Sequence, residues 1–310
     1  MARKKGSRWL LPTLAVGGAV LAAAWLSDPS RLLRAEFARQ RFLAGARLRR
    51  RSLADGEVSY LEAGRGEPVL YVHGFTGMKE NWLPLLGAMG RQRLHLAPDL
   101  PGWGESVRGE GLDYGYAEQA RRLAEFIDAR IGGPVDVVGH SMGGGIAAVL
   151  AARHPDKVRR LVLLDAAGVR FSDNAFGMAV LEGANPFGVG DEASFSDYMK
   201  LVFERPPWLP GRVARLLVQR RIADADFEQG VLDTIGRGED AFLPEREAAH
   251  IAAPTLLMWC RGDRVVDASA AAIYASRIRD SRIVLLEGAS HMPMMECTAA
   301  SAAAIKEFLA

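Results

Sequence analysis

The sequence predicts an α/β fold in which a mostly parallel central sheet is covered by helices on both faces. Three observations lead to this prediction. Apolar, β-rich segments alternate with helical segments over most of the 310 residues. The alternation stops between about residues 168 and 247, where no strand pattern occurs and a helical insertion is expected. A glycine-rich turn at Gly139–Gly143 joins a β-rich run directly to a strong helix former.

Length and composition are consistent with one domain that carries an insertion. A chain of 310 residues with 49% apolar and 25% charged residues can bury one sizeable core. A net charge of +2 gives no electrostatic footprint for nucleic acid. Cys260 and Cys297 are the two cysteines, and they provide neither a disulfide framework nor metal-ligand spacing.

The first 27 residues predict a single-pass membrane anchor. The uncharged run Trp9–Leu26 would span about 27 Å as a helix, enough for a thin bilayer core. Basic residues precede the run, and Trp9 and Trp25 lie near its ends, where interfacial aromatics occur. A cleaved signal peptide is the alternative, because Ala22–Ala24 offers a cleavage site. The charges do not indicate which side of the membrane the enzyme faces.

Residues 28–56 are expected to form a basic amphipathic connector. Eight arginines lie between Arg31 and Arg51, interspersed with leucine and phenylalanine. Such a segment suits contact with anionic lipid headgroups. The alternative is that this segment is a solvated helix packed on the main domain. We expect the main domain to cover residues 57–310.

Hydrophobic periodicity and helix signals place the remaining elements in order along the chain. Strands are expected at 57–63, 69–73, 94–98, 135–140, 158–165, 255–260 and 282–287. Helices are expected at 82–89, 116–131, 142–153, 268–278 and 298–309.

Ser141 is the candidate nucleophile. It stands between Gly139 and Gly143 at the predicted strand-to-helix turn. Such a turn strains the serine backbone, and a Cβ at the flanking glycines would collide with the neighbouring strand or helix. The helix that follows begins at Met142, so its first N–H groups and the positive end of its dipole can stabilise an oxyanion near the serine.

His291 is the candidate general base among six histidines. It lies in a loop after the strand at 282–287 and before the final helix. The other five are expected to be structural or to lie in a connector, and they are His73, His95, His140, His154 and His250. His140 precedes Ser141 and should point to the opposite side, as neighbours on a strand do. His73 should stabilise its loop by hydrogen bonding.

Asp263 is the candidate acid that orients the imidazole. It follows the apolar strand at 255–260, so it emerges at the same sheet edge as Ser141 and the His291 loop. Two competitors remain open: Asp267 lies four residues further along the same loop, and Asp165 ends the strand at 158–165.

The oxyanion hole requires a second N–H donor besides that of Met142. The donor should come from the loop after the strand at 69–73, where a His-Gly pair turns the backbone towards the site. The sequence therefore predicts Phe75 and Met142 as the two donors.

Taken together, these motifs resemble the alpha/beta-hydrolase family of serine esterases and lipases over residues 57–310. The resemblance rests on His73–Phe75, Asp99–Ser106, the Gly139–Gly143 turn, Trp259–Asp263 and Gly288–His291, in the family's order. Within the family, the chain is most similar to membrane-anchored monoacylglycerol lipases. Cys260 replaces the glycine usual in its motif. Haloalkane dehalogenases and epoxide hydrolases of this family use an aspartate nucleophile, which Ser141 argues against.

The resemblance implies an alpha/beta-hydrolase fold with a helical cap inserted after strand six, at about 168–247. Apolar residues of the cap, together with Met292, Met294 and Met295, could line an acyl site. The cap residues are Phe171, Phe176, Met178, Phe187, Phe195, Tyr198, Met199, Phe203 and Trp208.

The expected activity is hydrolysis of a lipid ester such as a monoacylglycerol, through an acyl-enzyme and without a metal or cofactor. Three other functions remain open. They are hydrolysis of a carbon–carbon bond in aromatic ring-cleavage products, a proline iminopeptidase-like activity, and a non-catalytic role at a membrane.

Overall fold

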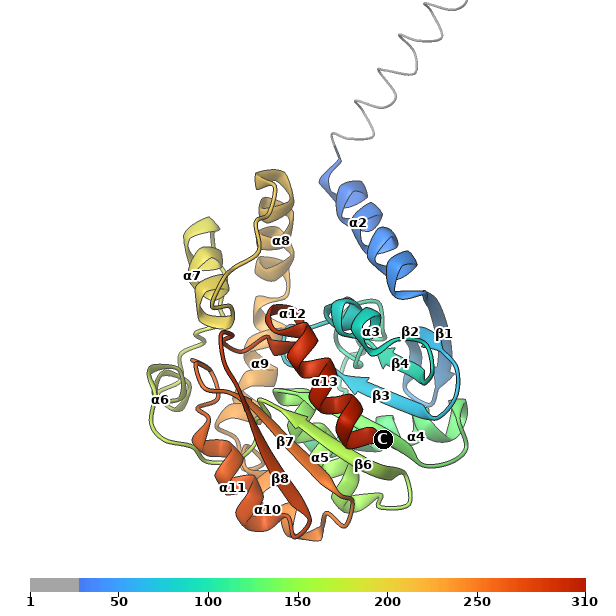
Figure 1. Ribbon diagram of the computed structural model, residues 1–310. Coiled ribbons are helices and arrows are strands. Elements are labelled where there is room, and N and C mark those ends of the chain that lie inside the picture. The colour runs from blue at the N-terminus through green and yellow to red at the C-terminus, as the bar shows by residue number, and fades with distance from the viewer. Residues whose placement is uncertain (1–27) are drawn as a thin grey trace, which may run out of the picture.

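A computed structural model describes residues 28–310 and contains an eight-stranded sheet with helices on both sides (Figure 1). The strand order is β1-β2-β4-β3-β5-β6-β7-β8. The strands are β1 (Ala46–Leu53), β2 (Gly56–Gly64), β3 (Pro68–Val72), β4 (Leu94–Pro98), β5 (Val135–His140), β6 (Val158–Leu164), β7 (Thr255–Cys260) and β8 (Ser281–Leu286). β2 pairs antiparallel with β1 and with β4, and all other neighbours are parallel. The predicted fold class is confirmed.

Side chains that alternate along the strands build a separate apolar core on each face of the sheet. On β3, Leu70 and Val72 belong to one core, and Val69 and Tyr71 belong to the other. The first core is covered by α4 (Tyr116–Arg130), α5 (Met142–Arg153) and α11 (Ser269–Arg277). The second is covered by α3 (Leu83–Met89) and α13 (Thr298–Leu309). Because both faces are buried, the central strands consist almost entirely of apolar residues.

The sheet begins earlier than the sequence predicted. The connector expected at 28–56 contains α2 (Pro29–Ala44), capped by Asp28, and then the edge strand β1. β1 runs antiparallel to β2 from Ala46 opposite Ala63 to Leu53 opposite Gly56. Two of its arginines pair with glutamates of β2, Arg49 with Glu62 and Arg50 with Glu57. These arginines therefore belong to the sheet edge, and only the first half of the connector is a helix.

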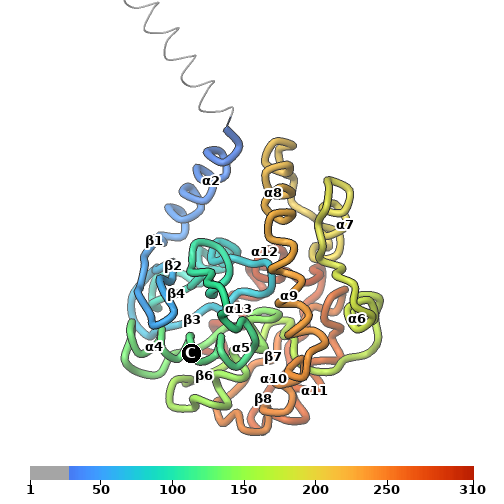
Figure 2. The backbone as a smooth tube through the Cα atoms, turned by 180° about the vertical axis from the view of Figure 1, so that it is seen from behind, coloured from blue at the N-terminus to red at the C-terminus, as the bar shows by residue number. Residues whose placement is uncertain are grey.

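The insertion lies between β6 and β7, as the sequence predicted. Its helices are α6 (Ala175–Leu181), α7 (Glu192–Val202), α8 (Gly211–Ala223) and α9 (Ala225–Gly236), and α7 and α8 rise above the sheet (Figures 1 and 2). A short helix, α10 (Leu243–Glu247), ends the predicted 168–247 range and packs against α5 of the main domain instead. We use "cap" below for α6–α9 and the loops between them.

Within residues 28–310, no helix combines the length and the apolar character needed to cross a bilayer. The anchor predicted at residues 1–27 lies outside the described residues.

Candidate active site

Ser141 occupies the sharp turn between β5 and α5, and its backbone has φ 53° and ψ −125°. Glycines make this turn possible. A Cβ on Gly143 would lie 2.3 Å from the carbonyl oxygens of Val72 and His73, and a Cβ on Gly139 would lie 2.5 Å from the carbonyl oxygen of Gly143. Real side chains do not tolerate such contacts. The predicted requirement for both glycines therefore has a direct steric cause.

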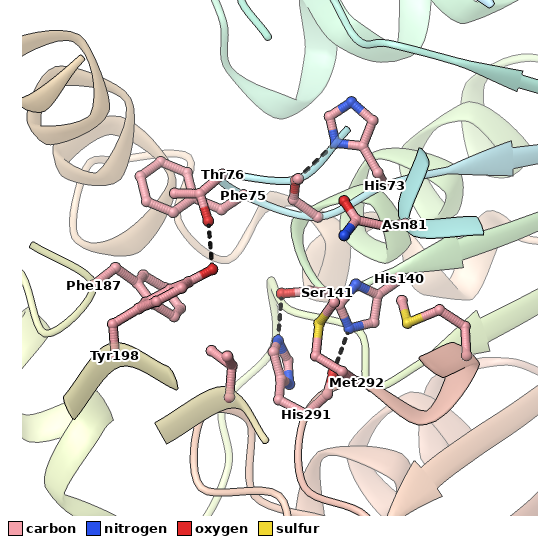
Figure 3. Close-up of a pocket in the computed structure, with 14 residues that line it drawn as sticks. His73, Phe75, Thr76, Asn81, His140, Ser141, Phe187, Tyr198, His291 and Met292 are labelled. Carbon is pink, nitrogen blue, oxygen red and sulfur yellow. Dashed lines mark hydrogen bonds between the residues drawn. The ribbon is translucent and has the colours of Figure 1, made fainter. Parts of the chain in front are cut away.

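The structure brings Ser141, His291 and Asp263 into one line of hydrogen bonds (Figure 3 shows the first two). Nε2 of His291 lies 2.9 Å from Oγ of Ser141, and its Nδ1 lies 2.7 Å from Oδ2 of Asp263. All three residues are buried. The other carboxylate oxygen of Asp263 accepts hydrogen bonds from the N–H groups of Val265 and Val266, at 2.7 and 3.1 Å. Asp263 is thereby fixed in a position that orients the imidazole.

The two competing aspartates have other partners. Oδ1 of Asp165 accepts a hydrogen bond from the N–H of Cys260 at 2.7 Å, and its Oδ2 has no hydrogen-bond partner among residues 28–310. Burial, followed by the nearby charge of Asp263, raises the pKa of Asp165 well above its usual range, which favours the protonated, neutral form of this carboxyl. Asp267 accepts from the N–H of Ser269 at the start of α11. Neither carboxyl is hydrogen bonded to His291.

The two predicted oxyanion donors border the serine. Met142 is the first residue of α5, and N–H groups in a helix's first turn have no intrahelical partner. Phe75 lines the same pocket as Ser141. Its loop lies directly against the serine, because a Cβ on Gly74 would be 2.9 Å from Cβ of Ser141. The role of the two N–H groups stays a prediction.

His140 contradicts the sequence analysis, which placed its side chain away from the site. Its ring lines the pocket and lies 4.8 Å, centroid to centroid, from the ring of His291. Nε2 of His140 is hydrogen bonded to the carbonyl oxygen of His291 at 2.7 Å (Figure 3). Strand alternation fails here because Ser141 leaves the strand with a positive φ. Burial keeps the pKa of His140 well below 6.5, so the ring is neutral and supports the His291 loop.

The remaining histidines have structural partners or positions. Nε2 of His73 accepts from the N–H of Leu100 at 2.9 Å, so its Nδ1 carries the proton and donates to the carbonyl oxygen of Gly74 at 2.8 Å. His73 thus supports the Phe75 loop, as the sequence predicted. His95 is hydrogen bonded inside the core, and burial lowers its pKa to about 4. His154 follows the last residue of α5, and His250 ends a short 3-10 helix.

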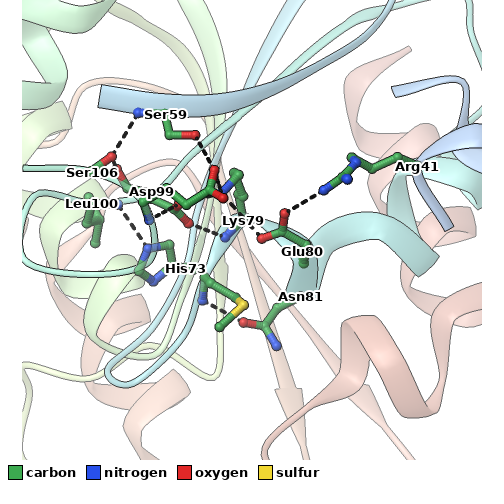
Figure 4. A network of polar contacts seen from close by, with 11 residues as sticks. Arg41, Ser59, His73, Lys79, Glu80, Asn81, Asp99, Leu100 and Ser106 are labelled. Carbon is green, nitrogen blue, oxygen red and sulfur yellow. Dashed lines mark hydrogen bonds and ion pairs between the residues drawn. The ribbon is translucent and has the colours of Figure 1, made fainter. Parts of the chain in front are cut away.

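A buried network behind the Phe75 loop was not predicted (Figure 4). Nζ of Lys79 lies 2.6 Å from Oδ2 of Asp99 and 3.2 Å from Oε2 of Glu105, and the Lys79 N–H donates to Oδ1 of Asp99. Burial lowers the pKa of Lys79, but Asp99, Glu80 and Glu105 together raise it above its usual value. Glu80 pairs in turn with Arg41 of α2. Lys79 and Asp99 are separated by a helix and a strand, so local patterns gave no signal for this pair.

The pocket above Ser141 has a mixed lining, in which apolar side chains face the polar groups around the serine. The apolar side chains come from the main domain and from the cap, and they are Phe75, Phe187, Val202, Met292 and Met294, with Tyr198 at the cap side. Of the nine cap residues named from the sequence, only Phe187 and Tyr198 line it. Trp208 and Met178 are exposed, and the other five pack against apolar cores.

Comparison with known proteins identifies the family. Residues 69–304 match the model of the alpha/beta hydrolase family. Lipase 1 of Psychrobacter immobilis is 31% identical over 267 residues, which are 83% of this chain and 82% of that protein. Monoacylglycerol lipase ABHD6 of Mus musculus is 28% identical, covering 96% and 93%. The crystal structure of a membrane phospholipase A superimposes with a TM-score of 0.87 at 32% identity, covering 98% of both chains. The chain therefore belongs to the alpha/beta hydrolase family, among its lipases and carboxylic ester hydrolases.

Proposed function

We propose that the protein hydrolyses carboxylic esters of lipids by way of an acyl-enzyme on Ser141. The observation that carries this proposal is the line of hydrogen bonds from Ser141 through His291 to Asp263, at 2.9 and 2.7 Å. A serine hydroxyl within reach of a base, with the base oriented by a buried carboxylate, is the arrangement that activates a serine nucleophile.

In the first half of the reaction, His291 takes the proton of Ser141 while the serine oxygen attacks the ester carbonyl. The N–H groups of Phe75 and Met142 stabilise the resulting oxyanion. His291 then gives the proton to the alcohol oxygen as the ester C–O bond breaks. Asp263 keeps the ring in the correct tautomer and stabilises the imidazolium. In the second half, His291 takes a proton from water, the hydroxide attacks the acyl group, and the proton returns to Ser141 as the acid leaves.

The lining of the pocket supports an acyl chain as the group bound above Ser141. Phe75, Phe187, Val202, Met292 and Met294 offer apolar surface, which favours a hydrocarbon over a small polar acyl group. The names of the relatives given above include a monoacylglycerol lipase. We therefore propose a monoacylglycerol as the substrate.

A substrate series tests this proposal. Purified protein is assayed on p-nitrophenyl esters of increasing chain length and then on monoacyl-, diacyl- and triacylglycerols. We expect kcat/KM to be highest for the monoacylglycerol. Preferred cleavage of a carbon–carbon bond in a ring-cleavage product, preferred cleavage of a prolyl p-nitroanilide, or no hydrolysis of any substrate would overturn the assignment.

We also propose that residues 1–27 anchor the enzyme in a membrane. The apolar run Trp9–Leu26 supports this, and α2, which follows it, projects from the same end of the molecule as α7 and α8 (Figures 1 and 2). Trp208, in the loop between α7 and α8, is 84% exposed. A large exposed aromatic residue is suited to the headgroup region of a bilayer.

Cell fractionation tests the anchor, with full-length protein compared with a variant that lacks residues 1–27. We expect full-length protein in the membrane fraction after a high-salt wash, and release or weakened binding of the truncated protein with unchanged kcat on p-nitrophenyl butyrate. Arginines of α2 supply only salt-sensitive binding, because ions screen their attraction to anionic lipid. A mature chain that begins near Trp25 would identify a cleaved signal peptide, and full-length protein found only in the soluble fraction would overturn the anchor.

A further inference from the structure

One helix of the cap, α7, contacts two loops of the candidate site. At its C-terminal end, the carbonyl oxygen of Val202 accepts a hydrogen bond from the N–H of His291 at 3.0 Å. The hydroxyl of Ser290 donates to the carbonyl oxygen of Leu201 at 3.2 Å. One turn earlier, the hydroxyl of Tyr198 is hydrogen bonded to Oγ1 of Thr76 at 3.2 Å, across the pocket (Figure 3). The cap therefore contacts the loop of the base and the loop of the Phe75 oxyanion donor.

Thr76 has an unfavourable backbone conformation. Its φ is 57°, in the left-handed region that a β-branched residue rarely adopts. Such strain persists only where surrounding contacts hold the backbone in place. Thr76 directly follows Phe75 in a turn closed by the hydrogen bond from the N–H of Gly77 to the carbonyl oxygen of Gly74, at 3.1 Å. Holding Thr76 therefore holds the turn that sets the direction of the Phe75 N–H.

Tyr198 is itself supported from the cap side. The guanidinium carbon of Arg221 lies 4.6 Å from the centre of the Tyr198 ring. Arg221 pairs with the buried Glu228 at 2.9 Å and donates to the carbonyl oxygen of Phe187 at 2.8 Å. The Tyr198 hydroxyl is thus presented to Thr76 by a side chain whose ring is already fixed.

We propose that Tyr198 is a positioning residue, whose hydroxyl holds the Thr76 turn so that the N–H of Phe75 points at the oxyanion position beside Ser141. The contact that holds the cap over the pocket is then the same contact that orients the second oxyanion donor. This inference rests on the proposed serine hydrolase function, and it gives the cap a role in the rate of the reaction besides its role in substrate choice.

Kinetics of single and double variants on p-nitrophenyl butyrate test the inference. Tyr198→Phe keeps the ring over Arg221 and removes only the hydroxyl, and Thr76→Val removes the partner hydroxyl at nearly constant volume. Loss of a whole oxyanion donor costs about a hundredfold to a thousandfold in kcat, so a misdirected donor should cost about tenfold, with KM nearly unchanged. The double variant should lose no more than either single variant, because both changes remove the same bond. Thr76→Ser, which retains a hydroxyl, should restore most of kcat.

Two further measurements separate positioning from a general structural effect. The Ki of butaneboronic acid, which forms a tetrahedral adduct with a serine hydroxyl, should rise in Tyr198→Phe by about the factor by which kcat falls. Tyr60→Phe is the matched control, since Tyr60 is buried on β2 and its ring packs on Phe126. It should leave kcat and Ki unchanged.

The inference is overturned by an unchanged kcat in Tyr198→Phe, by additive losses in the double variant, or by equal losses in Tyr60→Phe. These outcomes are distinct from failure of the proposed function. If Ser141→Ala were active on the same ester, the nucleophile itself would be misassigned.

Discussion

The two walls of the pocket are held in place by different means. The wall contributed by the main domain is built from backbone: Gly139 and Gly143 allow contacts that no side chain permits, and Ser141 lies where β5 meets α5. The wall contributed by the cap depends on side-chain contacts, such as Tyr198 to Thr76 and Arg221 to Glu228, and on hydrogen bonds from the His291 loop to carbonyl oxygens at the end of α7.

The cap also has little apolar core of its own. Its separate buried cluster consists of Val189, Phe195 and Val218, whereas each face of the sheet is covered by a large core. A wall fixed by steric necessity has essentially one arrangement, and a wall fixed by a few polar contacts can be adjusted by single substitutions. Changes to the catalytic residues on the main-domain wall should therefore abolish the reaction, and changes to the cap wall should alter its rate or its dependence on the substrate.

The largest expected effect is that of Ser141→Ala. Loss of the nucleophile should reduce kcat on p-nitrophenyl butyrate at least about a thousandfold and abolish labelling by a fluorophosphonate. His291→Ala should have a similar effect, because nucleophile and base act as a unit. The thermal midpoint of unfolding of Ser141→Ala should stay close to that of the parent protein, because removal of one hydroxyl opens no large cavity. Substantial turnover without the Ser141 hydroxyl would contradict the proposed mechanism.

Asp263→Asn should follow, with a loss of about a thousandfold or more in kcat, because an amide favours the wrong imidazole tautomer. Asp267→Asn is the matched control in the same loop and should lower kcat only slightly, since Asp267 contacts Ser269 and not His291. The kcat values of the two variants, measured on one ester, decide the assignment. If Asp267→Asn lost most of its activity while Asp263→Asn stayed active, Asp267 and not Asp263 would be the acid that orients His291.

Asp165→Asn should leave activity nearly intact and change the pH dependence of stability. The pKa of Asp165 is raised in the folded protein, so the native state binds its proton more tightly than the unfolded chain does. The stability that this group contributes is therefore full below its ordinary pKa of 3.8 and is lost as pH rises through the folded value. Asparagine cannot ionise and can still accept from the N–H of Cys260. Thermal unfolding at several pH values should show a variant at least as stable as the parent at pH 8, and a less stable variant there would argue that Asp165 is charged.

A smaller effect, confined to the cap, is expected for Arg221→Gln. The change leaves the buried carboxylate of Glu228 without its partner, and breaking a buried ion pair costs about 3–5 kcal/mol. We expect the thermal midpoint to fall by about 6 °C or more. KM should rise more for long-chain esters than for butyrate, as Phe187 and Tyr198 lose support. Arg215→Gln on the same helix is the control, because its partner Glu192 is exposed, and equal effects of the two changes would refute this account.

The same difference between the walls explains how much could be predicted from sequence. Strand ends of a parallel sheet meet at one edge, so Ser141, Asp263 and His291 could be placed together from local patterns alone. The edge strand β1 was missed because its arginines are exposed on both faces, which leaves no alternating apolar pattern to detect.

The cap could be predicted as a helical insertion, but its contacts could not. Tyr198 meets Thr76 from 122 positions away in the chain, and no local signal marks either residue. The orientation of His140 was predicted wrongly because strand alternation was extended through a turn at which Ser141 adopts a positive φ.

The smallest effect should come from the loop between α7 and α8, where the cap carries the exposed Trp208. If this loop lies in the headgroup region, Trp208→Ser should reduce activity on monoacylglycerol presented in phosphatidylglycerol vesicles by about threefold, in line with the loss of one interfacial aromatic residue. Activity on soluble p-nitrophenyl butyrate should not change, because Trp208 does not line the pocket. Ile222→Ser is a suitable control, since Ile222 is also an exposed apolar residue of the cap but lies near the opposite end of α8. Vesicle assays at several lipid concentrations would separate a change in surface binding from a change in kcat. Equal losses on vesicles and on the soluble ester would show that Trp208 supports the fold of the cap and does not contact the lipid surface.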